Sequence, residues 1–185
     1  MKRPSFSVSV EGSVFILLAM MLLMLPLSWV MAAILAASIH ELFHIWATML
    51  LSGRIYKLKI GAGGAKMEVA AMPAGREMIV AAAGPIGSAL VVLLAKWMPR
   101  TAICAFVHCV YNLLPLYPLD GGRILRGLCN CLLTEGNADR IFSVFQTICH
   151  IFLLLLCVPA ALQWGILPAS VLAIFLVRKR NMRTV

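Results

Sequence analysis

Two histidines and a glutamate near position 40 have the spacing of a metal-dependent hydrolytic site. The segment reads His40-Glu41-Leu42-Phe43-His44. On a helix, side chains four residues apart lie on one face, so both imidazoles can bind the same ion. Zinc lowers the pKa of a bound water to about 7, and the neighbouring carboxylate can accept its proton. The pattern therefore predicts His40 and His44 as zinc ligands and Glu41 as the general base.

The surroundings of this segment strengthen the functional interpretation. From Val14 to Leu51, Glu41 is the only formally charged side chain. An Asp, Lys or Arg at the centre of a membrane helix costs about 2.5–3.5 kcal/mol even on the lenient insertion scale. Nothing in the neighbouring sequence requires this cost, so a chemical role is the economical explanation.

A catalytic zinc site needs a third protein ligand and leaves a fourth position for water. Asp120 is the strongest candidate, because it alone among the acidic residues directly follows a long apolar run. The chain has seven acidic residues, which are Glu11, Glu41, Glu68, Glu77, Asp120, Glu135 and Asp139.

The segment before Asp120 contains Pro115 and Pro118, which cannot continue a helix. Non-helical backbone at membrane depth is tolerated only where it is buried in protein or lines a watery cavity. The two glycines that follow the aspartate allow a sharp turn, so the carboxylate can swing back towards a metal. The alternative is an ordinary helix-end residue that pairs with Arg123, but the histidine pair favours the ligand role.

The composition indicates a membrane protein. The chain has 185 residues, of which 62% are hydrophobic, and its mean hydropathy is +0.97. Soluble domains are usually about 45–50% apolar, so most of this chain must face a lipid bilayer. The net charge of +9 fits basic loops that set orientation and contact anionic headgroups. No aromatic residues are interleaved with the basic ones, so we expect no nucleic-acid binding.

The apolar segments predict an all-α polytopic membrane protein with about six transmembrane helices. As one helix, the stretch from Val14 to Leu51 would be about 57 Å long, nearly twice the ~30 Å core of a bilayer. It must therefore form two spans, with a turn around Pro26–Trp29. The predicted spans are residues 13–28, 30–51, 77–96, 101–119, 141–158 and 163–178.

The basic residues predict the orientation of these spans. An even number of spans places both termini on one side of the membrane. Of the 16 basic residues, all but Lys96 and Arg100 then fall on that side. By the positive-inside rule, both termini are predicted to be cytoplasmic.

Residues 54–69 are too short and too polar to span. Apolar residues alternate with charged ones in two short runs, and a glycine-rich segment separates the runs. This pattern predicts a small membrane-associated β-hairpin after the second span. Its free edge would be able to pair with an extended peptide. The alternative is an irregular basic loop that lies on the lipid headgroups.

Two motifs taken together resemble the site-2 proteases, a family of intramembrane zinc metalloproteases. The first is HExxH at 40–44, and the second is N-x-x-P-x-x-x-x-D-G at 112–121. The hairpin at 54–69 resembles the membrane-dipping hairpin of that family. A stretch of small residues, which let helices approach closely, resembles the family's third core helix and contains Ala83, Gly84, Pro85 and Ser88.

The resemblance implies a role for each motif residue. His40, His44 and Asp120 correspond to the zinc ligands. Glu41 corresponds to the general base, which later protonates the leaving amine. Asn112 is implied to position the substrate or to stabilise the oxyanion, and a hydrogen bond between helices is the alternative role.

The order of spans is most similar to the stage IV sporulation protein FB branch of the family. This similarity implies a multi-pass protein of the bacterial cell membrane that cleaves a pro-sigma factor-like substrate, with possible membrane regulatory partners. We expect residues 1–185 to form one integral membrane metalloprotease domain without a PDZ or CBS domain. Phe43 stands where the family often has glycine, and such a bulky ring is expected to reshape the cavity.

Other interpretations use the same residues. A metal transporter or metal-binding membrane protein would also place His and Asp in its spans, but it would need ionisable residues along a route across the bilayer. A protease-like scaffold without activity would be expected to have lost motif residues, and here all are present. His108 lies one helical turn before Asn112, where it is either a neighbour of the metal site or an ordinary buried histidine.

Overall fold

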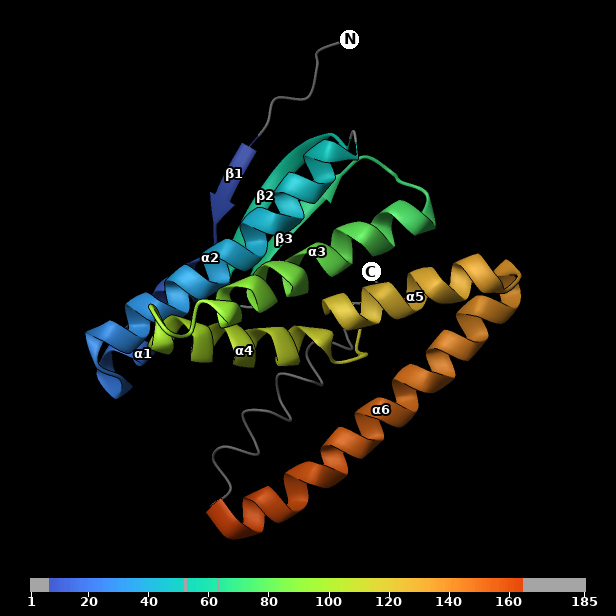
Figure 1. The fold of residues 1–185 in the computed structure, drawn as a ribbon. Coiled ribbons are helices and arrows are strands. Elements are labelled where there is room, and N and C mark those ends of the chain that lie inside the picture. Colours follow the sequence, from blue (N-terminus) through green and yellow to red (C-terminus); the bar gives the residue numbers. More distant parts are fainter. Residues whose placement is uncertain (1–6, 52, 63, 165–185) are drawn as a thin grey trace.

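The computed structural model describes residues 7–51, 53–62 and 64–164, and it is mostly helical (Figure 1). Within these residues there are six helices and one small sheet. In chain order the elements are β1 (Ser7–Val10), α1 (Gly12–Met24), α2 (Leu27–Leu50), β2 (Ile55–Gly61), β3 (Gly64–Val69), α3 (Ala74–Leu93), α4 (Pro99–Leu113), α5 (Asp120–Leu132) and α6 (Glu135–Trp164).

The long apolar stretch is divided between α1 and α2, as the sequence predicted. The break falls at Leu25 and Pro26, both of which have extended backbone. Proline disfavours the helical conformation in the residue before it and cannot donate a backbone hydrogen bond, which explains why α1 ends here. Trp29, at the far end of the predicted turn, already belongs to the first turn of α2.

Two helices of the described part, α2 and α3, are long and apolar enough to cross a membrane. The shorter α1 is also apolar, and none of its residues is buried in the protein. Large hydrophobic side chains are exposed along the outer faces of all these helices, for example Leu23, Trp46 and Leu93. Water would oppose such exposure and lipid favours it. Six membrane spans remain a prediction.

Helices α2, α3 and α4 pack side by side and form the core of the molecule (Figure 1). The buried side chains at their contacts are small. One cluster joins Ala36, Val91 and Ala105, and a second is made by Ala47, Val80 and Ala83. Small residues let helix backbones approach closely, which is how membrane helices gain packing energy without a hydrophobic driving force.

The predicted hairpin is confirmed, since β2 and β3 are antiparallel neighbours with Ile60 opposite Ala65. The alternative of an irregular loop is therefore wrong. The sequence analysis missed β1, which pairs with β2 in parallel and makes the sheet three-stranded, in the order β1-β2-β3. As a result, β3 is an edge strand, and it lies against α2.

The predicted span 101–119 is too long, because α4 ends at Leu113. Pro115 and Pro118 explain this early end, since they leave residues 114–119 as a loop. The glycines after Asp120 do not form the predicted sharp turn; they lie in the first turn of α5.

The last described helix also differs from the prediction. Helix α6 begins at Glu135, ahead of the predicted start at 141, because its first turns are polar and give no apolar signal. The helix continues to Trp164, past the predicted end at 158. This extension includes a proline, which is tolerated inside a membrane helix where neighbouring groups satisfy the freed backbone. Most of the predicted span 163–178 lies outside the described residues.

Candidate metal centre

The two histidines of the HExxH segment lie on the buried stripe of α2. This stripe repeats every four residues and consists of Ala32, Ala36, His40, His44 and Thr48. The imidazoles are 2% and 3% exposed, so both are removed from solvent. Their Nε2 atoms are 3.1 Å apart. The helical spacing therefore brings the two rings to one point, as predicted.

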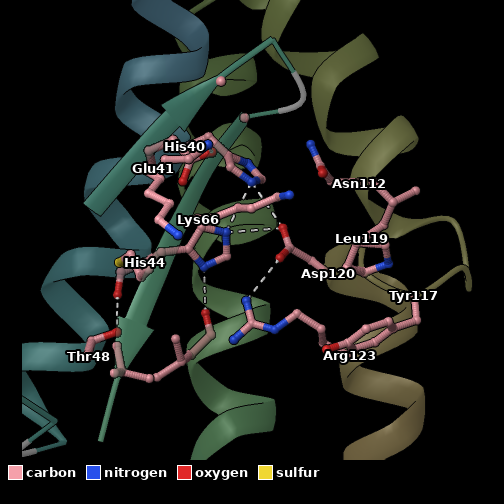
Figure 2. A pocket seen from close by; sticks show the side chains of 18 of the residues that line it. His40, Glu41, His44, Thr48, Lys66, Asn112, Tyr117, Leu119, Asp120 and Arg123 are labelled. Carbon is pink, nitrogen blue, oxygen red and sulfur yellow. Dashed lines mark hydrogen bonds and ion pairs between the residues drawn. The ribbon is translucent and has the colours of Figure 1, made fainter. Parts of the chain in front are cut away.

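Asp120 joins this pair from a distant part of the chain. It is the first residue of α5 and is 6% exposed. Its Oδ2 atom lies 3.0 Å from Nε2 of His40 and 3.1 Å from Nε2 of His44 (Figure 2). The three side chains form the one group of potential metal ligands found among the described residues. The structure thus brings together the three residues that the sequence singled out as ligands.

The second nitrogen of each imidazole is held by α3. Nδ1 of His44 lies 2.7 Å from the carbonyl oxygen of Val80, to which it must donate its proton. Nδ1 of His40 lies 2.9 Å from the hydroxyl oxygen of Ser88, which is fully buried. Partners of this kind fix the orientation of metal-binding histidines. From the sequence, Ser88 was predicted only as a small packing residue, and Val80 was not identified.

The donor set fits a zinc ion. Because His44 donates through Nδ1, the neutral ring presents an Nε2 lone pair to the carboxylate of Asp120. Two such acceptors at 3.1 Å repel each other unless a proton or a metal ion lies between them, and a metal ion satisfies both. Ligand atoms of a tetrahedral zinc at about 2.0–2.2 Å are about 3.3 Å apart, close to the separations observed here. Imidazole nitrogen and carboxylate oxygen are ordinary zinc ligands.

Gly84 leaves the space that the imidazoles occupy. It lies on the face of α3 between Val80 and Ser88, the two residues that hold the histidines. A β-carbon at this position would collide with Nε2 of both His40 and His44. The small residue is therefore required by the candidate metal centre as well as by helix packing.

Asp120 also forms the ion pair that the sequence analysis considered as an alternative to metal binding. Its Oδ1 atom lies 3.6 Å from Nη1 of Arg123, while Oδ2 faces the histidines. Nε of Arg123 in turn lies 3.8 Å from the carboxylate of Glu77 on α3. The two interpretations are thus compatible, because they use different oxygens of one carboxylate.

The predicted general base, Glu41, lies beside the cluster and contacts the sheet. Its Oε1 atom accepts a hydrogen bond from the backbone N–H of Ala65 on β3, at 3.1 Å. Both the carboxylate and the ligand cluster line a cavity of about 630 Å³.

A second carboxylate, that of Glu68 on β3, is exposed outside this cavity. A hydrogen bond from Lys59 holds the pKa of Glu68 below its usual value.

Asn112 lies on the wall of the same cavity, outside the ligand cluster (Figure 2). Its Nδ2 atom donates to the carbonyl oxygen of His108, 3.0 Å away on the same helix. The ring of His108 meets that of His40 edge-on, with centroids 4.5 Å apart. The buried Nε2 atom of His108 has no hydrogen-bond partner among the described residues. His108 is therefore a neighbour of a candidate ligand.

Phe43 packs at the contact between α2 and α3, and the effect of its bulk on the cavity stays a prediction. Its side chain is absent from the described residues that line the cavity. The ring packs against Gly87 of α3 and meets Trp46 edge-on, with centroids 6.0 Å apart. The ring therefore lies in the contact between α2 and α3, beside Ala47 and Val80.

Comparison with known proteins places this arrangement in a known fold. No family model and no curated protein sequence matches the chain. The structure is similar to that of a site-2 protease from Methanocaldococcus jannaschii, with a TM-score of 0.67 and 18% sequence identity. The match covers 97% of this chain and 93% of the other. The chain therefore has the fold of a solved site-2 protease.

Proposed function

We propose that the protein is an intramembrane zinc metalloprotease. The observation that supports this most strongly is the convergence of one carboxylate oxygen and two imidazole nitrogens, 3.0–3.1 Å apart and buried. The likeness in fold to a site-2 protease gives independent support. A structural ion pair would not need two histidines whose outer nitrogens are both held in place.

His40, His44 and Asp120 would hold the zinc. The chemistry that zinc supplies when bound is the activation of a water molecule near neutral pH. Glu41 lines the same cavity and accepts a hydrogen bond from the N–H of Ala65 through Oε1, and it would act as the general base that takes up a proton and returns it to the leaving amine. Arg123 holds the other oxygen of Asp120 and keeps the carboxylate oriented.

The edge of β3 supports an extended peptide as substrate. The carbonyl of Ile60 accepts a hydrogen bond from the N–H of Glu11, so the polar backbone groups of Ile60 face β1. Ala65, its partner in the antiparallel ladder, directs its groups the opposite way, towards the cavity. A substrate segment that unwinds there is able to pair with the edge strand. The partner we propose is a membrane protein with a locally unwound segment.

Sequence resemblance extends the proposal to location and substrate. The proposed protein is a multi-pass protein of the bacterial cell membrane with both termini cytoplasmic. The proposed substrate is a pro-sigma factor-like regulatory protein, as in the sporulation branch of the family, and the proposed process is regulated intramembrane proteolysis. The distribution of basic residues supports the orientation, and the resemblance in the order of spans supports the substrate class.

The experiment that tests this proposal uses the purified chain and a reporter that carries one transmembrane segment between two soluble tags. The expected result is cleavage within the segment, loss of cleavage after zinc removal with a chelator, and recovery when zinc is added. Full cleavage by protein that elemental analysis shows to be free of metal would contradict the proposal.

A further inference from the structure

A buried glutamine contacts the loop that leads to Asp120. Gln146 lies in the apolar part of α6 and is 1% exposed. Burying an amide without hydrogen bonds costs roughly 1–3 kcal/mol in proteins. The burial of this side chain therefore calls for polar partners, and the structure provides them.

Both ends of the Gln146 amide bind backbone groups of the loop 114–119. Its Oε1 atom accepts a hydrogen bond from the N–H of Tyr117 at 2.9 Å. Its Nε2 atom donates to the carbonyl oxygen of Pro115 at 2.5 Å. Prolines limit this loop to short turns, such as the bond from the N–H of Leu119 to the carbonyl of Leu116, and unpaired backbone groups are costly in an apolar setting. Gln146 thus replaces two of the missing backbone interactions.

The loop is in direct backbone contact with the first turn of α5. A β-carbon at Gly121 would collide with the carbonyl of Leu113, and one at Gly122 would collide with the backbone between Leu116 and Tyr117. The two glycines let these backbones touch. Because they immediately follow Asp120, a shift of the loop is passed to the residue that carries the candidate ligand.

Neighbouring side chains of α6 fix the same loop. Phe142 lies one turn before Gln146, is 6% exposed and meets the ring of Tyr117 edge-on. Cys149 lies one turn after it and packs against the buried pair Leu116 and Leu119. One face of α6 therefore contacts the loop over about two turns, with the glutamine at its centre.

We propose that Gln146 is a positioning residue that holds Asp120 in place for metal binding. The inference rests on the proposed function, because it assigns the residue a role in the zinc site. Gln146 does not touch the metal centre. It fixes the loop, and the loop fixes the start of α5, so that Oδ2 of Asp120 stays within 3.1 Å of both imidazoles.

The test compares metal binding by the wild-type chain and three variants of it. Gln146→Met keeps the size of the side chain and removes both hydrogen bonds. Gln146→Glu, in the neutral form that burial favours, restores a donor and an acceptor of the same length. Thr147→Val is the control, because Thr147 is exposed and bonds only to the Ser143 carbonyl of its own helix.

The measurements are the affinity for zinc in competition with a chelator and the visible spectrum of the cobalt-substituted protein, which reports coordination geometry. Loss of a residue that orients a ligand typically weakens metal affinity by roughly 10–100-fold. We expect this loss and an altered cobalt spectrum for Gln146→Met, recovery for Gln146→Glu, and no change for Thr147→Val.

Unchanged affinity and an unchanged spectrum in Gln146→Met would overturn the inference while leaving the proposed function intact. Failure of the wild-type chain to bind zinc would contradict both. If Gln146→Met does not fold, the comparison rests on Gln146→Glu. A zinc affinity equal to that of the wild type supports the inference. A folded Gln146→Glu protein that binds zinc as weakly as a chain without the Asp120 carboxylate overturns it.

Discussion

Gly84 of α3 lies so close to His44 of α2 that a β-carbon at position 84 would overlap with the Nε2 atom of the imidazole. The same β-carbon would also collide with Nε2 of His40. The small residue is required because the metal-binding atoms occupy the space where a side chain would be.

We therefore expect Gly84→Ala to abolish zinc binding while the helices remain formed. The added methyl group has to displace both imidazoles, and they cannot move far because Val80 and Ser88 hold their outer nitrogens. The measurement is the zinc content of the purified variant. Gly75→Ala is the matched control, since it lies on the same helix and its β-carbon meets nothing within 4 Å. Equal zinc content in both variants would contradict the packing argument.

Glu41→Gln is expected to retain zinc and fold but to lose cleavage. The amide keeps the shape of the side chain and cannot accept a proton, and general-base catalysis is typically worth about 10²–10⁴-fold in rate. The measurement is the cleavage rate of a transmembrane reporter, with zinc content determined on the same preparation. Proteolysis at the wild-type rate in a clean preparation would exclude this role.

Glu68→Gln is the control for that experiment, because Glu68 is an exposed carboxylate on β3 paired with Lys59 at 2.9 Å. The hydrogen bond from Lys59 lowers the pKa of Glu68. The ion pair is therefore intact at neutral pH and is lost only as the pH falls through that lowered value. Exposed ion pairs contribute little, so the variant is expected to cleave at nearly the wild-type rate.

Arg123→Gln is expected to weaken zinc affinity by roughly tenfold. This is the lower end of the roughly 10–100-fold range that is typical when a residue that orients a metal ligand is lost. Arg123 lies 3.6 Å from Oδ1 of Asp120, so its loss frees the carboxylate to rotate. Arg76→Gln is the control, because Arg76 is an exposed residue of α3 whose guanidinium donates to the carbonyl of Leu51. Chelator competition measures both variants, and equal affinities would show that the Arg123 contact does not orient the ligand.

Ser88→Ala removes the hydroxyl that holds Nδ1 of His40 at 2.9 Å. A roughly 10–100-fold loss of zinc affinity is expected, because the ring is then free to turn. Ser88→Cys keeps a weak hydrogen-bonding group of similar size, so its affinity is expected to lie between those of the wild type and the alanine variant. The same chelator competition gives the order of the three proteins, and an alanine variant as tight as the wild type would rule out this role.

The sequence predicted the parts of the site that follow from local spacing. His40 and His44 meet because a helix places residues four apart on one face. Asp120 was identified because an acidic residue after a proline-interrupted apolar run needs a reason to be there. The hairpin was predicted because alternation with period two is a strong strand signal.

The missed features depend on contacts between distant segments. β1 has only four residues and pairs with a strand about fifty positions later, which no local pattern encodes. α5 was missed because Gly121 and Gly122 are poor helix formers, and only the structure shows that close backbone contact requires them. Gln146 is flanked by other polar residues, namely Ser143, Thr147 and His150. The sequence therefore did not distinguish it, and only its burial in the structure does.

The most direct test of the account is the zinc content of the purified wild-type chain and of Asp120→Ala, measured by elemental analysis after dialysis against metal-free buffer. The account predicts about one zinc per chain in the wild type and almost none in the variant, because three ligands are needed to retain the ion. A wild-type chain without zinc, or a variant that keeps a full complement, would contradict it.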